Sequence, residues 1–507
     1  MDFWNFLLCL LVIWISRQAF LYFVRSKRLP PGPKPLPVIG NLLELGEKPH
    51  KSLAKLSKRF GPIMSLKLGQ VTTIVVSSAS MAEEVLQTHD RFFSNRTIPD
   101  SVKACKHDEF CLPFMPVSSS WRNLRKICNT YLFSGKVLNG NQNLRSKKLE
   151  ELLANVTETM SKGEALDIGR AAFKTALNLL STTIFSLDLA DPIGDNAREL
   201  KDTVWGILEE VGTPNLADYF PFLKKIDPQG IRKRTTSHLE KLIQLFNQII
   251  NKRLQFRRKM PGSISDSDML DTLINISEQN CEDMDQTRIE RLFVDIFVAG
   301  TDTTSATVEW AMAELLSNPE ILSKAKAELD QVIGKGNQVK ESDTAKLPYL
   351  QAIIKETLRL HPPGPFLLPR RAEAEVEISG FTVPKGAQIL VNAWAIGRDS
   401  SMWEDPNSFK PERFLGLDID VRGRSFELIP FGSGRRICPG LPLAMRMLYL
   451  ILGSLIHSFA WELEDEKITM EDKFGLSLHL AQPLRARPRP LPPAYKNFDV
   501  NPRGGYV

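Results

Sequence analysis

The chain has 507 residues, 43% of them hydrophobic and 24% charged, which is enough apolar material for one large core. The net charge of +6 is mild, and neither a basic run interleaved with aromatic residues nor a zinc-finger spacing occurs, so we expect no nucleic-acid binding. The six cysteines form no CxxC pair, which argues against a disulfide framework and favours a reducing compartment. No interior linker divides the chain, so we expect a single large domain rather than several.

The N-terminal segment is typical of a membrane anchor. Phe3 to Val24 is largely apolar and about 22 residues long, enough to cross a bilayer. Arg25, Lys27 and Arg28 follow at once, and no small-residue cleavage site is present. We therefore predict a single-pass anchor at residues 1–25 with the rest of the chain cytosolic. Arg17 interrupts the apolar run, so a shallow interfacial segment is the alternative.

A basic and proline-rich linker is predicted at residues 26–40, because consecutive prolines hold the chain extended. The main domain then runs over residues 41–507. Ser65 to Val76 alternates apolar and polar residues around Gly69, which predicts a hairpin of two strands.

The rest of the chain is predicted to be mainly α with a minor β region. Helical spacing dominates residues 150–335, and short strand-like runs return at residues 375–391. The stretch from residue 485 to residue 507 is proline-rich and polar, and we expect it to end as a loose tail.

A loop from Phe431 to Gly440 carries the most informative pattern. Gly432 and Gly434 permit a tight turn, and Cys438 lies just before a helical pattern. A sulfur at a helix N-terminus, with Arg436 nearby, is favoured as a thiolate, which is a metal ligand or a nucleophile.

Other kinds of site also contain a cysteine after a glycine-rich turn. A buried structural cysteine is common. A dinucleotide loop would need a third glycine where Ile437 stands. No second cysteine or histidine lies at zinc spacing from Cys438. A cysteine hydrolase with a distant histidine stays open.

A helical pattern at residues 288–316 contains the run from Phe297 to Thr304. Gly300, Asp302 and three threonines have low helix propensity. Their occurrence together inside a helix indicates that these positions serve a function. A small-residue contact between helices is the alternative. Two further helices are predicted to carry close pairs, Glu356 with Arg359 and Trp121 with Arg125.

The pattern Phe-x-x-Gly-x-Arg-x-Cys-x-Gly at residues 431–440 resembles the haem-binding loop of the cytochrome P450 family. The resemblance covers nearly the whole chain and implies a cytochrome P450 fold with haem b as cofactor and Cys438 as the iron ligand. Phe431 would pack beside the sulfur, and Arg436 would pair with a haem propionate. The cofactor-binding residues that it implies are Trp121, Arg125, Ala299, Gly300, Arg370, Phe431, Gly434, Arg436, Cys438 and Gly440.

The same resemblance assigns two further groups of residues. Asp302 and Thr303 match the family's acid–alcohol pair, so they are expected to be catalytic in proton delivery. Glu356, Arg359 and Arg413 resemble a buried ionic cluster with a structural role. By analogy the substrate pocket is lined by Phe114, Phe293, Phe297, Phe366, Leu367, Leu368 and Leu478.

The resemblance is strongest to plant enzymes that hydroxylate terpenoids, the group that includes geraniol hydroxylase and ferruginol synthase. The stretches at residues 214–221 and 298–305 carry it. It implies a monooxygenase of the endoplasmic reticulum membrane that uses O2 on a lipophilic small molecule. No nicotinamide or flavin fingerprint occurs in this chain, so electrons from NADPH would arrive through a membrane-bound reductase.

Two alternatives to that activity stay open. A haem-thiolate isomerase or dehydratase would keep the fold without oxygenation, although the presence of Asp302 and Thr303 argues against it. A membrane-tethered haem sensor or carrier would bind haem without turnover.

Overall fold

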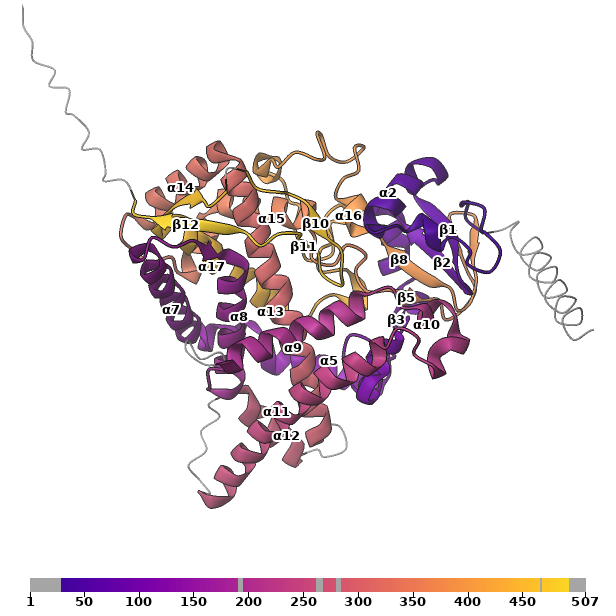
Figure 1. Ribbon diagram of the computed structural model, residues 1–507, viewed down its shortest axis with the longest axis horizontal. Helices are drawn as coiled ribbons and strands as arrows, with labels where there is room; N and C mark the ends of the chain where they lie inside the picture. Colours follow the sequence, from indigo (N-terminus) through magenta and orange to yellow (C-terminus); the bar gives the residue numbers. More distant parts are fainter. Residues whose placement is uncertain (1–28, 190–194, 261–267, 280–283, 466, 492–507) are drawn as a thin grey trace, which may run out of the picture.

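The computed structural model describes residues 29–189, 195–260, 268–279, 284–465 and 467–491. Helices form most of this part of the chain and small sheets lie at its margins, which confirms the predicted mainly-α class (Figure 1). The predicted anchor at residues 1–25 lies outside the described residues.

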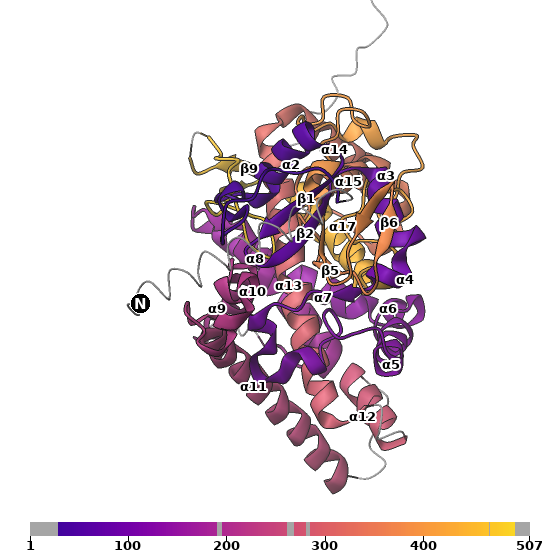
Figure 2. The same ribbon diagram turned by 90° about the vertical axis from the view of Figure 1, so that its right-hand side faces the viewer.

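The largest sheet has five strands in the order β1-β2-β8-β5-β3. These strands are β1 (Ile63–Leu68), β2 (Val71–Val76), β3 (Asn95–Arg96), β5 (Arg370–Arg371) and β8 (Gln388–Val391). The predicted hairpin is confirmed: β1 and β2 are antiparallel, and Gly69 turns the chain with a φ of +58°. Strand β8 joins β2 in parallel from more than 300 residues further along the sequence, so segments far apart in the chain build this sheet (Figures 1 and 2).

The helices around the centre of the molecule are α5 (Ser119–Ile127), α7 (Gln142–Ser161), α8 (Ile168–Phe185), α9 (Asp195–Gly212), α11 (Ile231–Lys259), α13 (Gln286–Ser317), α15 (Pro348–Leu360) and α17 (Leu441–Ser458). The other helices are α2 (Pro49–Phe60), α3 (Ala79–Glu83), α4 (Asp90–Phe93), α6 (Gly135–Gly140), α10 (Leu216–Tyr219), α12 (Met269–Gln279), α14 (Pro319–Ile333) and α16 (Ala393–Ile396).

Helix α13 runs through the middle of the molecule and packs along α8 (Figure 1). The carboxylate of Asp285 caps its start by accepting a hydrogen bond of 2.8 Å from the Arg288 N–H. It ends at Ser317, just before Pro319 opens α14. The predicted helix at residues 288–316 is therefore confirmed.

Helix α17 follows the Cys438 loop and carries Pro442 in its first turn, where a proline needs no N–H partner. Within the described residues it is the one helix long and apolar enough to cross a membrane. However, 67% of it is buried inside the protein, as expected for a core helix.

The proline-rich linker is docked rather than free where the structure describes it. The Ser65 N–H of β1 donates to the Pro31 carbonyl at 2.9 Å, and its hydroxyl donates to the Pro30 carbonyl at 2.6 Å. A Cβ on Gly32 would lie 1.9 Å from the Ser65 oxygen, so only glycine permits this approach. The linker thus extends the β1 edge.

The predicted loose tail is wrong for its first residues. Arg485–Arg489 forms β12, which pairs with β9 (Ala460–Leu463) and, at its start, with β4 (Leu166–Asp167). Pro488 lies beyond the end of β4, where β12 is an edge on that side and tolerates a missing N–H. Residues 492–507 lie outside the described part.

The remaining strands form two hairpins. They are β6 (Val376–Ile378) with β7 (Phe381–Val383), and β10 (Asp472–Lys473) with β11 (His479–Leu480). The first confirms the strands predicted near residue 375, and the second brings residues 476–480 against α13.

Candidate active site

The Cys438 loop folds into the predicted tight turn. Gly434 has a φ of +67°, and a Cβ on it would lie 2.2 Å from the Leu86 carbonyl oxygen, so this position requires glycine. The Cys438 N–H donates to the Phe431 carbonyl at 3.0 Å and closes the loop. The sulfur is thereby fixed at the start of α17.

Opposing influences act on the ionisation of Cys438. Burial raises the pKa of its thiol, while the N–H groups of Gly440 and Leu441 and the guanidinium of Arg125 act to lower it. The net shift is upward, so the helix start alone does not produce the thiolate that the sequence suggested. A metal cation at the sulfur would supply the missing positive charge.

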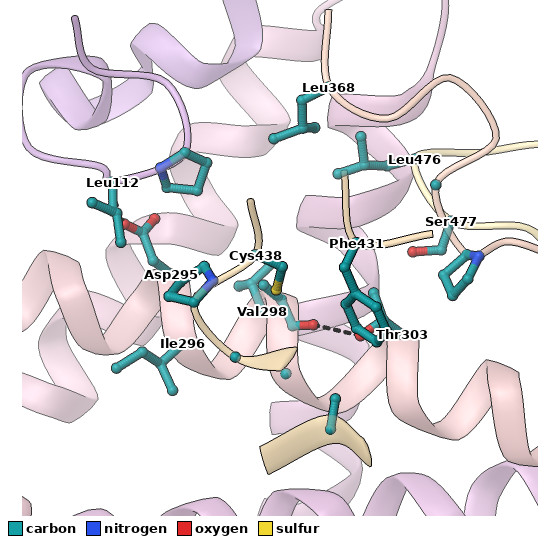
Figure 3. A pocket seen from close by; sticks show the side chains of 18 of the residues that line it. Leu112, Asp295, Ile296, Val298, Thr303, Leu368, Phe431, Cys438, Leu476 and Ser477 are labelled. Carbon is teal, nitrogen blue, oxygen red and sulfur yellow. Dashed lines mark hydrogen bonds between the residues drawn. The ribbon is translucent and has the colours of Figure 1, made fainter. Parts of the chain in front are cut away.

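Cys438 opens into a cavity of about 390 Å³ between its loop and helix α13. In Figure 3, Cys438, Phe431, Val298 and Thr303 lie near one another, with Asp295 and Leu112 to one side and Leu476 and Ser477 to the other. Most of the other side chains that line it are aliphatic or aromatic. An enclosed apolar space with a few polar groups is typical of a cofactor or lipophilic-ligand site.

Four arginines line the same cavity: Arg96, Arg125, Arg370 and Arg436. Strands β3 and β5 place Arg96 directly opposite Arg370. Arg436 donates to the carbonyls of Ser94, Leu112 and Met115, and its guanidinium lies 4.5 Å from the centre of the Trp121 ring.

Trp121 and Arg125 both contact main-chain carbonyls beside the cavity. Trp121 Nε1 donates to the Leu112 carbonyl at 3.2 Å, and Arg125 donates to the Ile437 carbonyl, next to Cys438. The structure therefore gathers all of the predicted propionate-binding residues at one cavity.

The negative charge near these guanidiniums does not compensate for their burial. Burial, followed by the charge of Arg370 and Arg125, lowers the pKa of Arg436 to about 10. Burial also lowers the pKa of Arg370 to about 10, although Asp90 opposes this. Arg96 is shifted in the same direction, and its buried Nε has no hydrogen-bond partner among the described residues. The cluster therefore fits a ligand with more than one carboxylate, which haem has in its two propionates.

Helix α13 divides the predicted catalytic pair between two faces. Thr303 lines the cavity, and its hydroxyl donates to the Ala299 carbonyl at 2.8 Å. Asp302 does not line it. Its Oδ2 lies 3.2 Å from His479 Nε2 of β11, and its buried Oδ1 has no partner among the described residues. Neighbouring residues on a helix point about 100° apart, which accounts for the separation.

Ala299 and Gly300 border the cavity, as predicted. A Cβ on Gly300 would come within 2.9 Å of Leu180 on α8. The glycine therefore permits close packing of α8 against α13.

The predicted ionic cluster is present and buried. Arg359 donates to both carboxylate oxygens of Glu356, at 2.6 and 2.7 Å, and neither side chain is exposed. Arg413 donates to Glu356 Oε1 at 3.0 Å, and Arg359 also reaches the carbonyls of Pro406 and Ser408. The cluster joins α15 to the segment before the Cys438 loop.

Three of the seven predicted pocket residues line the cavity: Phe114, Leu367 and Leu368. Phe293 and Phe297 do not, because they lie on the opposite face of α13 and pack against Phe185 of α8, with ring centroids 4.9 and 5.6 Å apart. A periodic pattern cannot tell the core face of a buried helix from its cavity face.

Phe366 and Leu478 also lie away from the cavity. Phe366 meets the Phe474 ring edge-on, and the main chain of Leu478 bonds to Pro363 and to the Trp310 indole. The neighbours Leu476 and Ser477 take the place expected for Leu478.

Three polar residues that line the cavity were not singled out from the sequence: Arg96, and His107 and Asp295, which lie in segments expected near the pocket. Arg96 gave no signal, because its place depends on strand pairing across the chain. Asp295 did give one: it is a lone acid among six apolar residues from Leu292 to Val298.

Taken together, a thiol ligand, a largely apolar cavity and a set of buried guanidiniums that can receive two carboxylates define the site of a haem-thiolate protein. Comparison with known proteins agrees. The Cytochrome P450 family model matches residues 30–485. The chain belongs to the cytochrome P450 family.

Three plant enzymes are similar to the chain over nearly its full length. The chain is 54% identical to geraniol 8-hydroxylase of Catharanthus roseus over 496 residues, covering 97% of this chain and all of the relative. It is 57% identical to geraniol 8-hydroxylase of Swertia mussotii over 479 residues, covering 94% and 96%. It is 51% identical to drimenol monooxygenase of Persicaria hydropiper over 494 residues, covering 96% and 97%. The chain is a haem-dependent monooxygenase that uses O2 and a redox partner on a small molecule.

Proposed function

We propose that this enzyme hydroxylates a plant terpenoid, most specifically a terpenoid that already carries a hydroxyl group. The observation that carries the proposal is near-full-length similarity to two enzymes named for geraniol and one named for drimenol. The cavity supports it, because its largely apolar lining suits a lipophilic molecule.

The residues that would hold haem b come from four parts of the chain. Cys438 would be the iron ligand, with Phe431 beside it. The two propionates would be held by Arg96, Arg125, Arg370, Arg436 and Trp121, all of which line the cavity. When bound, haem supplies the activation of O2. In the balanced reaction, one oxygen atom enters a C–H bond and the other leaves as water, with two electrons and two protons consumed.

In this proposal Thr303 and Asp302 have different tasks. The Thr303 hydroxyl faces the cavity, so it holds and passes a proton at the reacting end of the substrate. Asp302, on the neighbouring face and paired with His479, supplies protons from behind α13. The apolar lining excludes other water from the substrate.

The proposal includes residence in the endoplasmic reticulum membrane through residues 1–25, with electrons from NADPH through a membrane-bound reductase. Docking of the proline-rich linker on β1 supports it, because a fixed linker would set the orientation of the domain above a membrane. Removal of residues 1–25 should move the enzyme from the membrane pellet to the supernatant.

The test is turnover by the full chain with a plant reductase, NADPH and O2 on a panel of terpenoid alcohols, terpene hydrocarbons and simple phenols. A hydroxylated terpenoid product, dependent on NADPH and O2, is expected. Haem-loaded enzyme that oxidises phenols but none of the terpenoids would overturn the substrate class. Conversion of substrate without O2 would overturn monooxygenation.

A further inference from the structure

Asp295 is the one carboxylate among the described residues that line the cavity. It lies four residues before Ala299 and eight before Thr303 on α13, and all three line the cavity. At 1.5 Å per residue, Asp295 stands about 6 Å along the helix from Ala299 and about 12 Å from Thr303. Figure 3 shows its carboxylate beside Leu112, on one side of the group formed by Cys438 and Thr303.

The carboxylate of Asp295 is held in a fixed orientation. Its Oδ2 accepts a hydrogen bond of 2.7 Å from the Leu112 N–H. Its Oδ1 lies 3.1 Å from His107 Nε2, and because an ionised carboxylate only accepts, that nitrogen carries the proton. Each oxygen has used one acceptor site and can accept a second hydrogen bond.

The segment that carries His107 and Leu112 is shaped to reach this carboxylate. The 3-10 stretch Asp100–Glu109 is kinked, and Cys105 and Lys106 adopt left-handed φ values of +53° and +55°. That conformation is unfavourable for residues other than glycine. Arg291, one turn before Asp295, also holds the segment by donating to the Cys105 carbonyl at 3.2 Å.

A buried carboxylate on an apolar cavity is costly unless donors reach it, and two donors leave part of its capacity unused. We propose that Asp295 accepts a hydrogen bond from a hydroxyl group of the substrate and is a specificity-determining residue. A bound hydroxyl would then direct the opposite end of the molecule toward Ala299, Thr303 and Cys438. This inference rests on the proposed function, and it adds the residue that recognises the hydroxyl group of the substrate.

A hydroxyl fits this position better than an ammonium group. His107 and Leu112 already donate to the carboxylate, and neutral donors can fill the acceptor sites that remain. Four guanidiniums also line the cavity, and their positive charge disfavours a cationic ligand.

The first test uses the unaltered haem-loaded enzyme and needs no variant. The dissociation constants of geraniol, its methyl ether and the hydrocarbon with methyl in place of the CH2OH group are measured from the substrate-induced change in the haem spectrum. The ether keeps the oxygen but cannot donate. We expect the ether and the hydrocarbon to bind about 10- to 100-fold more weakly than geraniol, as for a lost hydrogen bond to a charged group.

The second test compares two variants that loosen the same loop. Asp295→Asn should narrow the preference for geraniol over its methyl ether to a few-fold, since a neutral acceptor is weaker. Arg291→Met removes the neighbouring tether but lies outside the cavity lining, so it should keep the full preference. The retained spectrum with carbon monoxide shows that each variant still binds haem.

Several results would overturn the inference. Equal binding of geraniol and its methyl ether by the unaltered enzyme would do so whatever the variants show. If Arg291→Met loses the preference for geraniol over its methyl ether as fully as Asp295→Asn does, Asp295 acts only by holding the loop. Tighter binding of the trimethylammonium analogue of geraniol, which cannot ligate iron, than of geraniol would assign the site to a cation. If none of the terpenoids binds or reacts, the result would instead contradict the proposed function.

Discussion

The two walls of the cavity are built in opposite ways. The wall that carries Cys438 is braced from behind by polar groups that pair with one another: Arg359 and Arg413 share Glu356, and the Cys438 loop is closed by its own main chain. The opposite wall is mostly apolar, and its few polar groups include Thr303 and the hydrogen-bonded pair of Asp295 and His107. The first wall is organised to stay fixed, and the second leaves polar capacity for a ligand.

The largest expected effect is on the first wall. Cys438→Ala should abolish the strongly red-shifted Soret band of the reduced carbon-monoxide complex and all turnover, because no other cysteine holds its place at the start of α17. Cys128→Ala is the matched control. Cys128 lines the same cavity, but burial raises the pKa of its thiol to about 12, so it stays a neutral side chain. Retention of the band in Cys438→Ala would refute the ligand assignment.

The next effect tests whether the first wall depends on its buried ions. Glu356→Gln leaves Arg359 and Arg413 without a countercharge and should destabilise the protein by about 3–5 kcal/mol. Chemical denaturation and the fraction of haem-loaded protein measure this. Lys324→Met, which breaks an exposed ion pair with Glu412, should leave both unchanged. If Glu356→Gln is as stable as the unaltered protein, the first wall does not depend on its buried ion pairs.

On the second wall, Thr303→Val should reduce product formed per NADPH by about 100-fold or more, as for the loss of a positioned proton donor. Binding of substrate should change little, because the side chain keeps its volume. Thr301→Val is the control, since Thr301 makes the same kind of hydrogen bond, to the Phe297 carbonyl, but lies away from the cavity. If the two variants form the same amount of product per NADPH, Thr303 has no role in proton delivery.

The smallest effect concerns the pair behind the second wall. Burial lowers the pKa of His479, but the hydrogen bond and charge of Asp302 outweigh burial and raise it above 6.5 overall. A raised pKa stabilises the folded protein below pH 6.5, and that contribution is lost as the pH rises through the folded-state pKa. Between pH 6 and pH 9 the Tm of the unaltered protein should therefore fall by about 1–2 °C more than that of His479→Gln. Parallel profiles would show that the pair contributes nothing.

The contrast between the walls also explains what the sequence could predict. Glycines at 432 and 434, the acid–base spacing of Glu356 and Arg359, and the position of Cys438 before a helix are local patterns, and each proved to have the expected geometry. The helices and the first hairpin were predicted for the same reason: their periodicity is local.

Features that depend on contacts between distant segments could not be predicted. Arg96 reaches the cavity only because β3 pairs with β5, and β12 forms only because β9 and β4 receive it. Rotation of α13 decides that Asp295 faces the cavity while Phe293 and Phe297 face the core. The apolar pattern is the same on both faces, so only packing against α8 settles the orientation.

The four guanidiniums that line the cavity have a consequence for the protein in the cell. Chains that have not received haem must keep these charges buried with Asp90 as the main carboxylate nearby, so the completed fold and the supply of haem are thermodynamically linked. When haem is scarce, such chains open more readily and become substrates for proteolysis. The abundance of this enzyme should therefore follow haem synthesis, and the arginines act as a checkpoint on its maturation.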